Sequence, residues 1–299
     1  MYQHKASFVI TMCTIYSISN AAPLDSWDES SSQNPEEFGE YYEGDIFMPH
    51  GGRNGIVGEA LRWNDGVIPF EISGYYNSKD LNLIKTAMDI YHKYTCISFR
   101  PKTQADKDYI AITNHQSGCW SSVGKQGGVQ EVNLESPQCT TKIGTSLHEL
   151  MHAVGFLHEQ NRHERDDFVT INWNNIKKGR EKNFNKAEQN GAEDFGVPYD
   201  FISVMHYSST AFSANGKRTI NPKDNKKVEK MGQREGFSKG DIMKINTMYN
   251  CPEKTQKLNI TGDITTDGIS NNESSSSDLG PFLQAANSLF SIFSRRRLY

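Results

Sequence analysis

The sequence is short of several features that would point to common protein classes. Beyond the N-terminus, no stretch approaches the roughly 20 consecutive apolar residues that a membrane-spanning helix needs. The formal net charge is −4, so nothing indicates the basic surface that nucleic-acid binding requires. We find no internal repeats. No G-x-S-x-G segment occurs, so nothing in the sequence marks a serine nucleophile.

The one apolar run of note lies at the start of the chain, where residues 1–21 have the features of a secretory signal. Lys5 gives a weak positive start, and the apolar run that follows is broken by small polar residues. Residues 19–21 form a small-x-small cleavage site, so Ala22 would begin a secreted chain. The alternative, a disordered or buried N-terminus, stays open.

Cysteines are few, and their number supports secretion. There are five, of which Cys13 would leave with the signal. The other four can pair completely and allow three connectivities, among which spacing alone does not choose: Cys96, Cys119, Cys139 and Cys251. A cytosolic protein with free thiols is the alternative.

Composition divides the rest of the chain into three parts. Residues 22–53 are polar and rich in Ser, Glu and Asp, so they cannot bury a core, and we expect a pro-segment or linker. This part ends at Arg53 in a flexible stretch, a suitable cut site for a trypsin-like protease. Residues 54–251 carry the folding signals, and residues 252–299 form a tail of low complexity.

The tail leaves two interpretations open. Apolar residues at helical spacing precede Arg295, Arg296 and Arg297, which favours an amphipathic helix for a partner or a membrane surface. A loosely docked or disordered tail is the alternative. Asn259 and Asn272 lie in acceptor sequences for N-glycosylation, as suits a secreted protein.

Hydrophobic patterns in the central part predict an α+β domain of two lobes with a cleft between them. Strands are expected over residues 67–72, 97–99, 109–113, 119–123 and 129–134. Asn77 and Ser78 can cap a helix, and further helices are expected at about 145–154 and 241–248. Periodicity is weak from His158 to Asp200, so we expect a mostly irregular second lobe.

The chain is organised around residues 148–158, which read H-E-x-x-H-x-x-G-x-x-H. His148 and His152 stand four residues apart, so on a helix both imidazoles leave the same face. Gly155 can take a positive φ at no steric cost, so it can end the helix and turn the chain. That turn would bring His158 back as a third ligand. A surface helix with scattered histidines is the alternative that this specific pattern disfavours.

Three histidines predict one catalytic zinc ion per chain, because they leave one coordination position open for water. Zinc so bound lowers the pKa of its water to about 7. Glu149 can accept the water's proton and later give it to a leaving amine, which amounts to peptide hydrolysis without a covalent intermediate. An inert structural zinc module would need neither Glu149 nor the open position.

Residues 148–166, HELMHAVGFLHEQNRHERD, resemble the signature of the astacin family of secreted zinc endopeptidases, a metzincin family. Glu159 after the third histidine is the position that distinguishes this family. Residues 203–207, SVMHY, are similar to the family's Met-turn. The resemblance implies that Met205 forms an apolar floor under the metal. It also implies that Tyr207 binds zinc at rest and swings away to stabilise the oxyanion.

The same resemblance covers about residues 54–251 and implies further features. It pairs Cys96 with Cys251 and Cys119 with Cys139. It places Trp120 on an edge strand that binds extended substrate. It also suggests that Lys223 lines the pocket for the side chain after the scissile bond, with a preference for Asp or Glu. A solvated lysine among its basic neighbours is the alternative.

Family members are made as zymogens in which an aspartate of an F-x-G-D motif occupies the open zinc position. This chain has Tyr42-Glu43-Gly44-Asp45, with Tyr in place of Phe. By resemblance, Asp45 would plug the zinc until the chain is cut after Arg53. The new amine of Asn54 would then turn inward toward Glu159. A catalytically silent binding or adhesion protein on a metalloprotease scaffold is the rival function, and the retained histidines and Glu149 argue against it.

Overall fold

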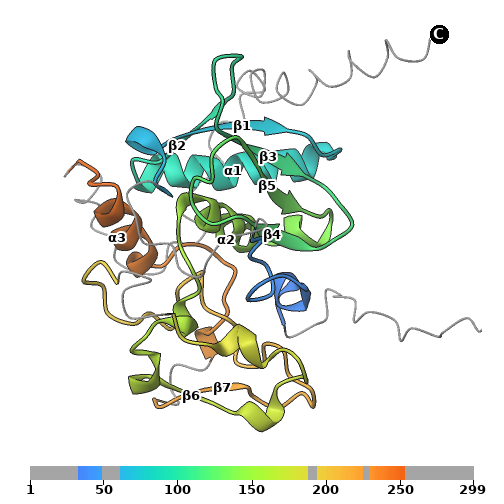
Figure 1. Ribbon diagram of the computed structural model, residues 1–299, viewed down its shortest axis with the longest axis vertical. Coiled ribbons are helices and arrows are strands. Elements are labelled where there is room, and N and C mark those ends of the chain that lie inside the picture. Colours follow the sequence, from blue (N-terminus) through green and yellow to red (C-terminus); the bar gives the residue numbers. More distant parts are fainter. Residues whose placement is uncertain (1–32, 49–60, 188–193, 225–228, 253–299) are drawn as a thin grey trace, which may run out of the picture.

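The computed structural model describes residues 33–48, 61–187, 194–224 and 229–252. The expected signal, the cut site at Arg53 and the tail from residue 253, with Asn259 and Asn272, therefore lie outside the described residues. Figure 1 shows the fold as an upper part built on a sheet and a lower part with little regular structure. No helix in the described ranges is long and apolar enough to cross a membrane.

The upper part is a five-stranded sheet with the order β2-β1-β3-β5-β4. Its strands are β1 (Val67–Ile72), β2 (Ser98–Pro101), β3 (Tyr109–Thr113), β4 (Cys119–Ser121) and β5 (Val129–Leu134). The first four in spatial order pair in parallel, and β4 closes one edge antiparallel to β5. Strands β1 and β3 are rich in β-branched residues and buried over most of their length, as expected when helices or loops cover a parallel sheet.

Helices α1 (Ser78–Tyr94) and α2 (Ile143–Val154) lie together beneath the sheet (Figure 1). Helix α1 begins at Asn77, whose side chain accepts a hydrogen bond from the backbone N–H of Asp80 at 3.0 Å. Its apolar face buries Leu81, Ile84, Met88 and Tyr91 against the core, as the helical spacing predicts. Helix α2 is buried along its whole length from Gly144 to Val154, so it runs through the interior of the domain.

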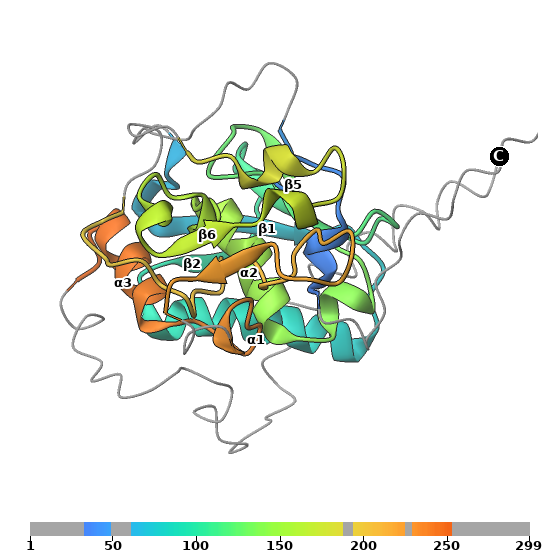
Figure 2. The same cartoon turned by 90° about the horizontal axis from the view of Figure 1, so that it is seen from below.

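The lower part holds a two-stranded antiparallel sheet, β6 (Val169–Ile171) with β7 (Ile220–Pro222), and several 3₁₀ turns. Figure 2 looks onto this end of the molecule. Helix α3 (Lys239–Met248) returns the chain to the upper part. The sequence predicted α3 two residues shorter and missed both strands of the small sheet, because three residues are too few to establish a period.

Two apolar clusters occupy the described residues, one in each part. The upper cluster includes Met205, and the lower one includes Tyr207 and Phe184. The disulfides are Cys96–Cys251 and Cys119–Cys139, the pairs that the resemblance implies. The α+β fold is therefore confirmed, and the segment that links the two clusters is the one that carries the expected Met-turn.

Candidate metal centre

Three imidazoles converge between the two clusters. His148 and His152 leave α2 one turn apart, and their Nε2 atoms lie 3.1 Å from each other. Gly155 ends the helix with φ +132°, and a Cβ there would meet the Met248 side chain at 2.7 Å. The turn brings His158 to the same point. One ligand atom from each histidine and from Asp45 all lie within 4.8 Å of one another.

The ring nitrogens of the two α2 histidines have distinct roles. Nδ1 of His148 lies 2.7 Å from the carbonyl oxygen of Val204, and Nδ1 of His152 lies 2.7 Å from that of Phe156. A carbonyl oxygen can only accept, so both Nδ1 atoms carry the hydrogen. In neutral imidazoles the Nε2 atoms then carry lone pairs that face each other. Two such lone pairs suit the binding of one metal ion between them.

Asp45 completes the group from the N-terminal segment. One carboxylate oxygen, Oδ2, lies 3.1 Å from Nε2 of His148 and 3.2 Å from Nε2 of His158. The other, Oδ1, is buried and has no hydrogen-bond partner within the described chain. Burial raises the pKa of Asp45, but His158, His152 and His148 outweigh it and hold that pKa well below its usual value.

His158 is held by a second carboxylate of the same segment, which the sequence reasoning did not single out. Its Nδ1 donates to Oε2 of Glu43 at 2.8 Å. Burial lowers the pKa of His158, yet Asp45 and Glu43 together raise it to about 9. The pocket therefore favours a positive charge at this ring, either a proton or a metal ion.

The surroundings of Glu149 indicate whether the three histidines and Asp45 form a suitable metal site. Both of its carboxylate oxygens are buried and lack a partner among the described residues. Its pKa is raised well above the ordinary value, first by burial and then by Asp45 and Glu36. A partnerless buried carboxylate beside three converging nitrogens suits a metal with its water, and a donor set of three imidazoles and one carboxylate suits zinc.

The Met-turn lies directly beneath these groups. Met205 is buried in the upper cluster, and its carbonyl accepts the backbone N–H of Glu159 at 3.1 Å. The ring of Tyr207 lies 4.6 Å from that of His158, centroid to centroid. Its hydroxyl donates to the carbonyl oxygen of Glu43 rather than pointing at the histidine nitrogens. Its expected role as a zinc ligand at rest stays a prediction.

The edge strand with Trp120 is occupied by the N-terminal segment. The N–H of Ser121 donates to the carbonyl of Asp45, and the N–H of Phe47 donates to that of Ser121, both at 2.9 Å. The segment therefore pairs in parallel with β4. The rings of Trp120, Tyr41 and Phe47 form one cluster, in which Trp120 lies 5.0 Å from Tyr41 and 5.3 Å from Phe47, centroid to centroid.

Two further anchors of this segment were missed by the sequence reasoning. Glu36 pairs with the guanidinium of Arg234, and neither side chain is exposed to solvent. Glu37 accepts from the N–H and the hydroxyl of Ser208 at 2.6 and 2.7 Å. These residues were invisible in the sequence because single acidic residues in a polar segment normally indicate a solvated chain.

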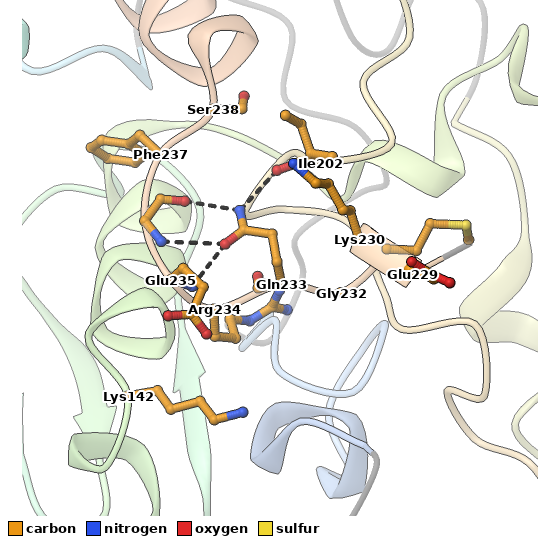
Figure 3. A pocket seen from close by; sticks show the side chains of 12 residues that line it. Lys142, Ile202, Glu229, Lys230, Gly232, Gln233, Arg234, Glu235, Phe237 and Ser238 are labelled. Carbon is orange, nitrogen blue, oxygen red and sulfur yellow. Dashed lines mark hydrogen bonds between the residues drawn. The ribbon is translucent and has the colours of Figure 1, made fainter. Parts of the chain in front are cut away.

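Arg234 is held by the loop that Figure 3 shows. Residues 229–238 line a cavity of about 330 Å³ together with Lys142 and Ile202. The Gln233 amide donates to the carbonyls of Ile202 at 2.8 Å and Gly236 at 2.9 Å (Figure 3). The loop thereby fixes the position of Arg234 relative to the Met-turn.

Lys223 lies elsewhere. It lines a cavity of about 500 Å³ in the lower part, with Trp173 and Phe184. None of the three histidines, Glu149 or Asp45 lines that cavity. Its expected role in substrate preference therefore stays a prediction, without support from contacts to the histidine group.

The comparisons with known proteins agree on one family. The family model described as "Astacin (Peptidase family M12A)" matches residues 56–250. Zinc metalloproteinase nas-13 of Caenorhabditis elegans is 49% identical over 203 residues, which are 68% of this chain and 44% of that protein. Zinc metalloproteinase nas-4 of the same organism is 41% identical over 225 residues, which are 72% of this chain and 70% of that protein. Meprin A subunit beta of Rattus norvegicus is 40% identical over 70% of this chain and 29% of its own length.

Among solved structures, high choriolytic enzyme 1, a hatching enzyme zinc-protease from Oryzias latipes, is similar with a TM-score of 0.61 and 39% identity. That likeness covers 67% of this chain and all of the other. The chain spans less than half the length of several curated relatives, 44% of nas-13 and 35% of nas-15 among them.

Proposed function

This chain belongs to the astacin family, and we propose that it is a secreted zinc endopeptidase held inactive by its own N-terminal segment. One observation carries the proposal. Three imidazole nitrogens and the Asp45 carboxylate converge in a buried site beside Glu149, whose oxygens have no partner in the described chain. We take protein and peptide chains as the substrates.

His148, His152 and His158 would hold the metal. Bound zinc would supply Lewis acidity, lowering the pKa of a water to about 7 and polarising the scissile carbonyl. Glu149 would take the proton of the attacking water and deliver it to the leaving amine. Tyr207, once free of Glu43, would donate a hydrogen bond to the oxygen on which negative charge develops.

Substrate would bind along β4 in place of the N-terminal segment. The backbone groups of Ser121 are those that Asp45 and Phe47 now use. An extended peptide can pair with the same groups, because an exposed strand edge offers a row of donors and acceptors. Trp120 would then contact substrate side chains where Tyr41 and Phe47 now lie. A role for Lys223 in preferring acidic side chains is an additional part of the proposal.

Latency would come from several contacts of residues 33–48. Asp45 would occupy the position that an attacking water needs, since its Oδ2 lies 3.2 Å from Nε2 of His158. The backbone carbonyl of Glu43 accepts a hydrogen bond from the Tyr207 hydroxyl. Glu36 neutralises Arg234 in the interior, and Glu37 binds Ser208. These contacts support a segment that blocks the metal, the oxyanion donor and the substrate strand at once.

Activation would follow a cut after Arg53 by a trypsin-like protease outside the cell. Both Arg53 and the new N-terminus at Asn54 lie outside the described residues, so this step rests on the sequence. Secretion rests likewise on residues 1–21.

The rival function, a binding protein on a silent protease scaffold, would not need Glu149. A buried carboxylate without a partner costs stability, and a chain free of catalytic demands has no reason to keep it. The retained Glu149 therefore favours the enzyme over the binding protein.

The test compares intact and cleaved protein. Purified secreted chain with zinc bound is assayed on casein before and after limited trypsin treatment, with Arg53→Ala as a control that resists the cut. We expect proteolysis only after cleavage of the unaltered chain, and its loss on chelation. If the cleaved protein with its zinc retained hydrolyses no protein substrate, the proposed activity is wrong.

A further inference from the structure

Glu159, the residue after the third histidine, is a buried carboxylate with a full set of partners. Its exposed fraction is 4%. Oε1 accepts from Nη1 of Arg162 at 3.0 Å and from the backbone N–H of Asp200 at 2.8 Å. Oε2 accepts from the ammonium of Lys244, which is itself 4% exposed. Glu159 is thus already neutralised before any cut of the chain.

Arg162 and Lys244 do not neutralise the charge of Glu159 equally. The guanidinium of Arg162 also binds Glu164, with Nε 2.6 Å from its carboxylate, so its charge is divided. Lys244 has Glu159 as its ion-pair partner in the described part of the chain. A buried carboxylate needs a dedicated counter-charge, because removing one partner of such a pair leaves an uncompensated charge in a low dielectric.

Lys244 lies on a helix that also supports another histidine. Asp241, three residues earlier on α3, accepts the backbone N–H of Val204 at 2.9 Å. The carbonyl of Val204 in turn accepts Nδ1–H of His148 at 2.7 Å. Helix α3 is therefore connected to the three histidines by two sets of contacts. Asp241 is linked through Val204 to His148, and Lys244 binds Glu159, the residue beside His158.

We propose that Lys244 is a positioning residue that supplies Glu159 with a built-in counter-charge, so the metal site is complete without the N-terminal amine that cleavage would create. The inference rests on the proposed function. It separates two effects of the cut: removal of the blocking segment is required, whereas the identity of the new first residue is not. A mature chain with a ragged N-terminus should then be fully active.

The experiment combines two cleaved forms, which differ in their first residue, with substitutions of Lys244. Cleaved forms beginning at Asn54 and at Gly52 are made through an engineered cut site, each with Lys244, Lys244→Met or Lys244→Arg. Lys239→Met is the matched control, because Lys239 is an exposed lysine on the same helix. The readouts are kcat/KM on a peptide, the chelator concentration that removes half the zinc, and Tm.

With Lys244 present, we expect the two N-termini to agree within threefold in kcat/KM and in zinc retention. We expect Lys244→Met to lower kcat/KM at least 30-fold and to lose zinc at lower chelator concentration. Lys244→Arg should recover at least a third of the activity, and Lys239→Met should match the unaltered chain.

Either of two results would overturn the proposal. One is a loss of more than tenfold on extending the unaltered chain to Gly52, which needs no folded Lys244 variant. The other is a Lys244→Met protein with lowered Tm but unchanged kcat/KM and zinc retention, which would make the lysine merely structural. If the Asn54 form cleaves nothing, the proposed function fails, while zinc retention still tests Lys244.

Discussion

Replacing Glu36 by glutamine should greatly weaken the binding of the N-terminal segment, residues 33–48, to the rest of the protein. Glu36 does not itself contact the histidines. Docking of the segment buries the guanidinium of Arg234, which is neutralised there by Glu36 alone among the described carboxylates within 4 Å. In Glu36→Gln the guanidinium is still desolvated on docking but has no counter-charge. Breaking a buried pair in this way costs about 3–5 kcal/mol. Since every 1.4 kcal/mol is a factor of ten, docking should weaken between about 100-fold and about 4000-fold.

The assay is inhibition of the cleaved enzyme by a synthetic peptide of residues 33–48. The matched control is Glu40→Gln in the same peptide, because Glu40 pairs with Arg180 through a carboxylate that is 67% exposed. An exposed pair contributes about 1 kcal/mol at most, so this peptide should inhibit within about fivefold of the unaltered one. If Glu36→Gln inhibits within tenfold of the unaltered peptide, the reasoning about the buried pair is refuted.

Three further predictions concern the same structure. Asp45→Ala should give the intact chain measurable proteolysis without any cut, whereas a fully silent intact variant would show that Asp45 is dispensable for latency. Burial raises the pKa of Glu37 from 4.5 to about 7, so the docked segment binds a proton more tightly than the free one. Peptide affinity should then fall by up to about 3 kcal/mol as pH rises from about 4.5 to about 7 and level off above, and inhibition constants for Glu37→Gln should lose that slope. Removal of the Cys119–Cys139 disulfide, which spans 20 residues, should lower the free energy of unfolding by about 3 kcal/mol in denaturant titrations; no change would contradict the loop-entropy argument.

The sequence was informative where a short-range pattern determines the structure. The helix expected at about 145–154 from the four-residue spacing of His148 and His152 is observed from Ile143 to Val154. The return of His158 follows from the conformational freedom of Gly155. The expected strands 67–72, 109–113 and 129–134 match the observed bounds. In each case the signal lies within one element, so it can be read without knowing the fold.

Long-range charge pairs could not be predicted in the same way. Glu36 and Arg234 lie 198 residues apart, and Glu159 and Lys244 lie 85 apart. Each is a single charged residue in a polar or charged stretch, where a solvated side chain is the usual expectation. Only the tertiary fold brings the partners together and excludes water, so burial and pairing became visible in the structure alone.

The role expected of Lys223 stays a prediction. The resemblance implies a lysine that lines a substrate pocket, and in the structure Lys223 lines a cavity of the lower part with Trp173 and Phe184. Short motifs fix the backbone near the metal, whereas a loop lysine has a long side chain whose direction depends on its local packing.

The central claim is that zinc at the three histidines and Glu149 together hydrolyse peptide bonds. It is tested most directly by measuring zinc content and casein hydrolysis side by side for cleaved protein with Glu149 or Glu149→Gln. The account predicts one zinc per chain in both, with hydrolysis lowered at least 1000-fold in Glu149→Gln. Equal hydrolysis at equal zinc content would contradict it.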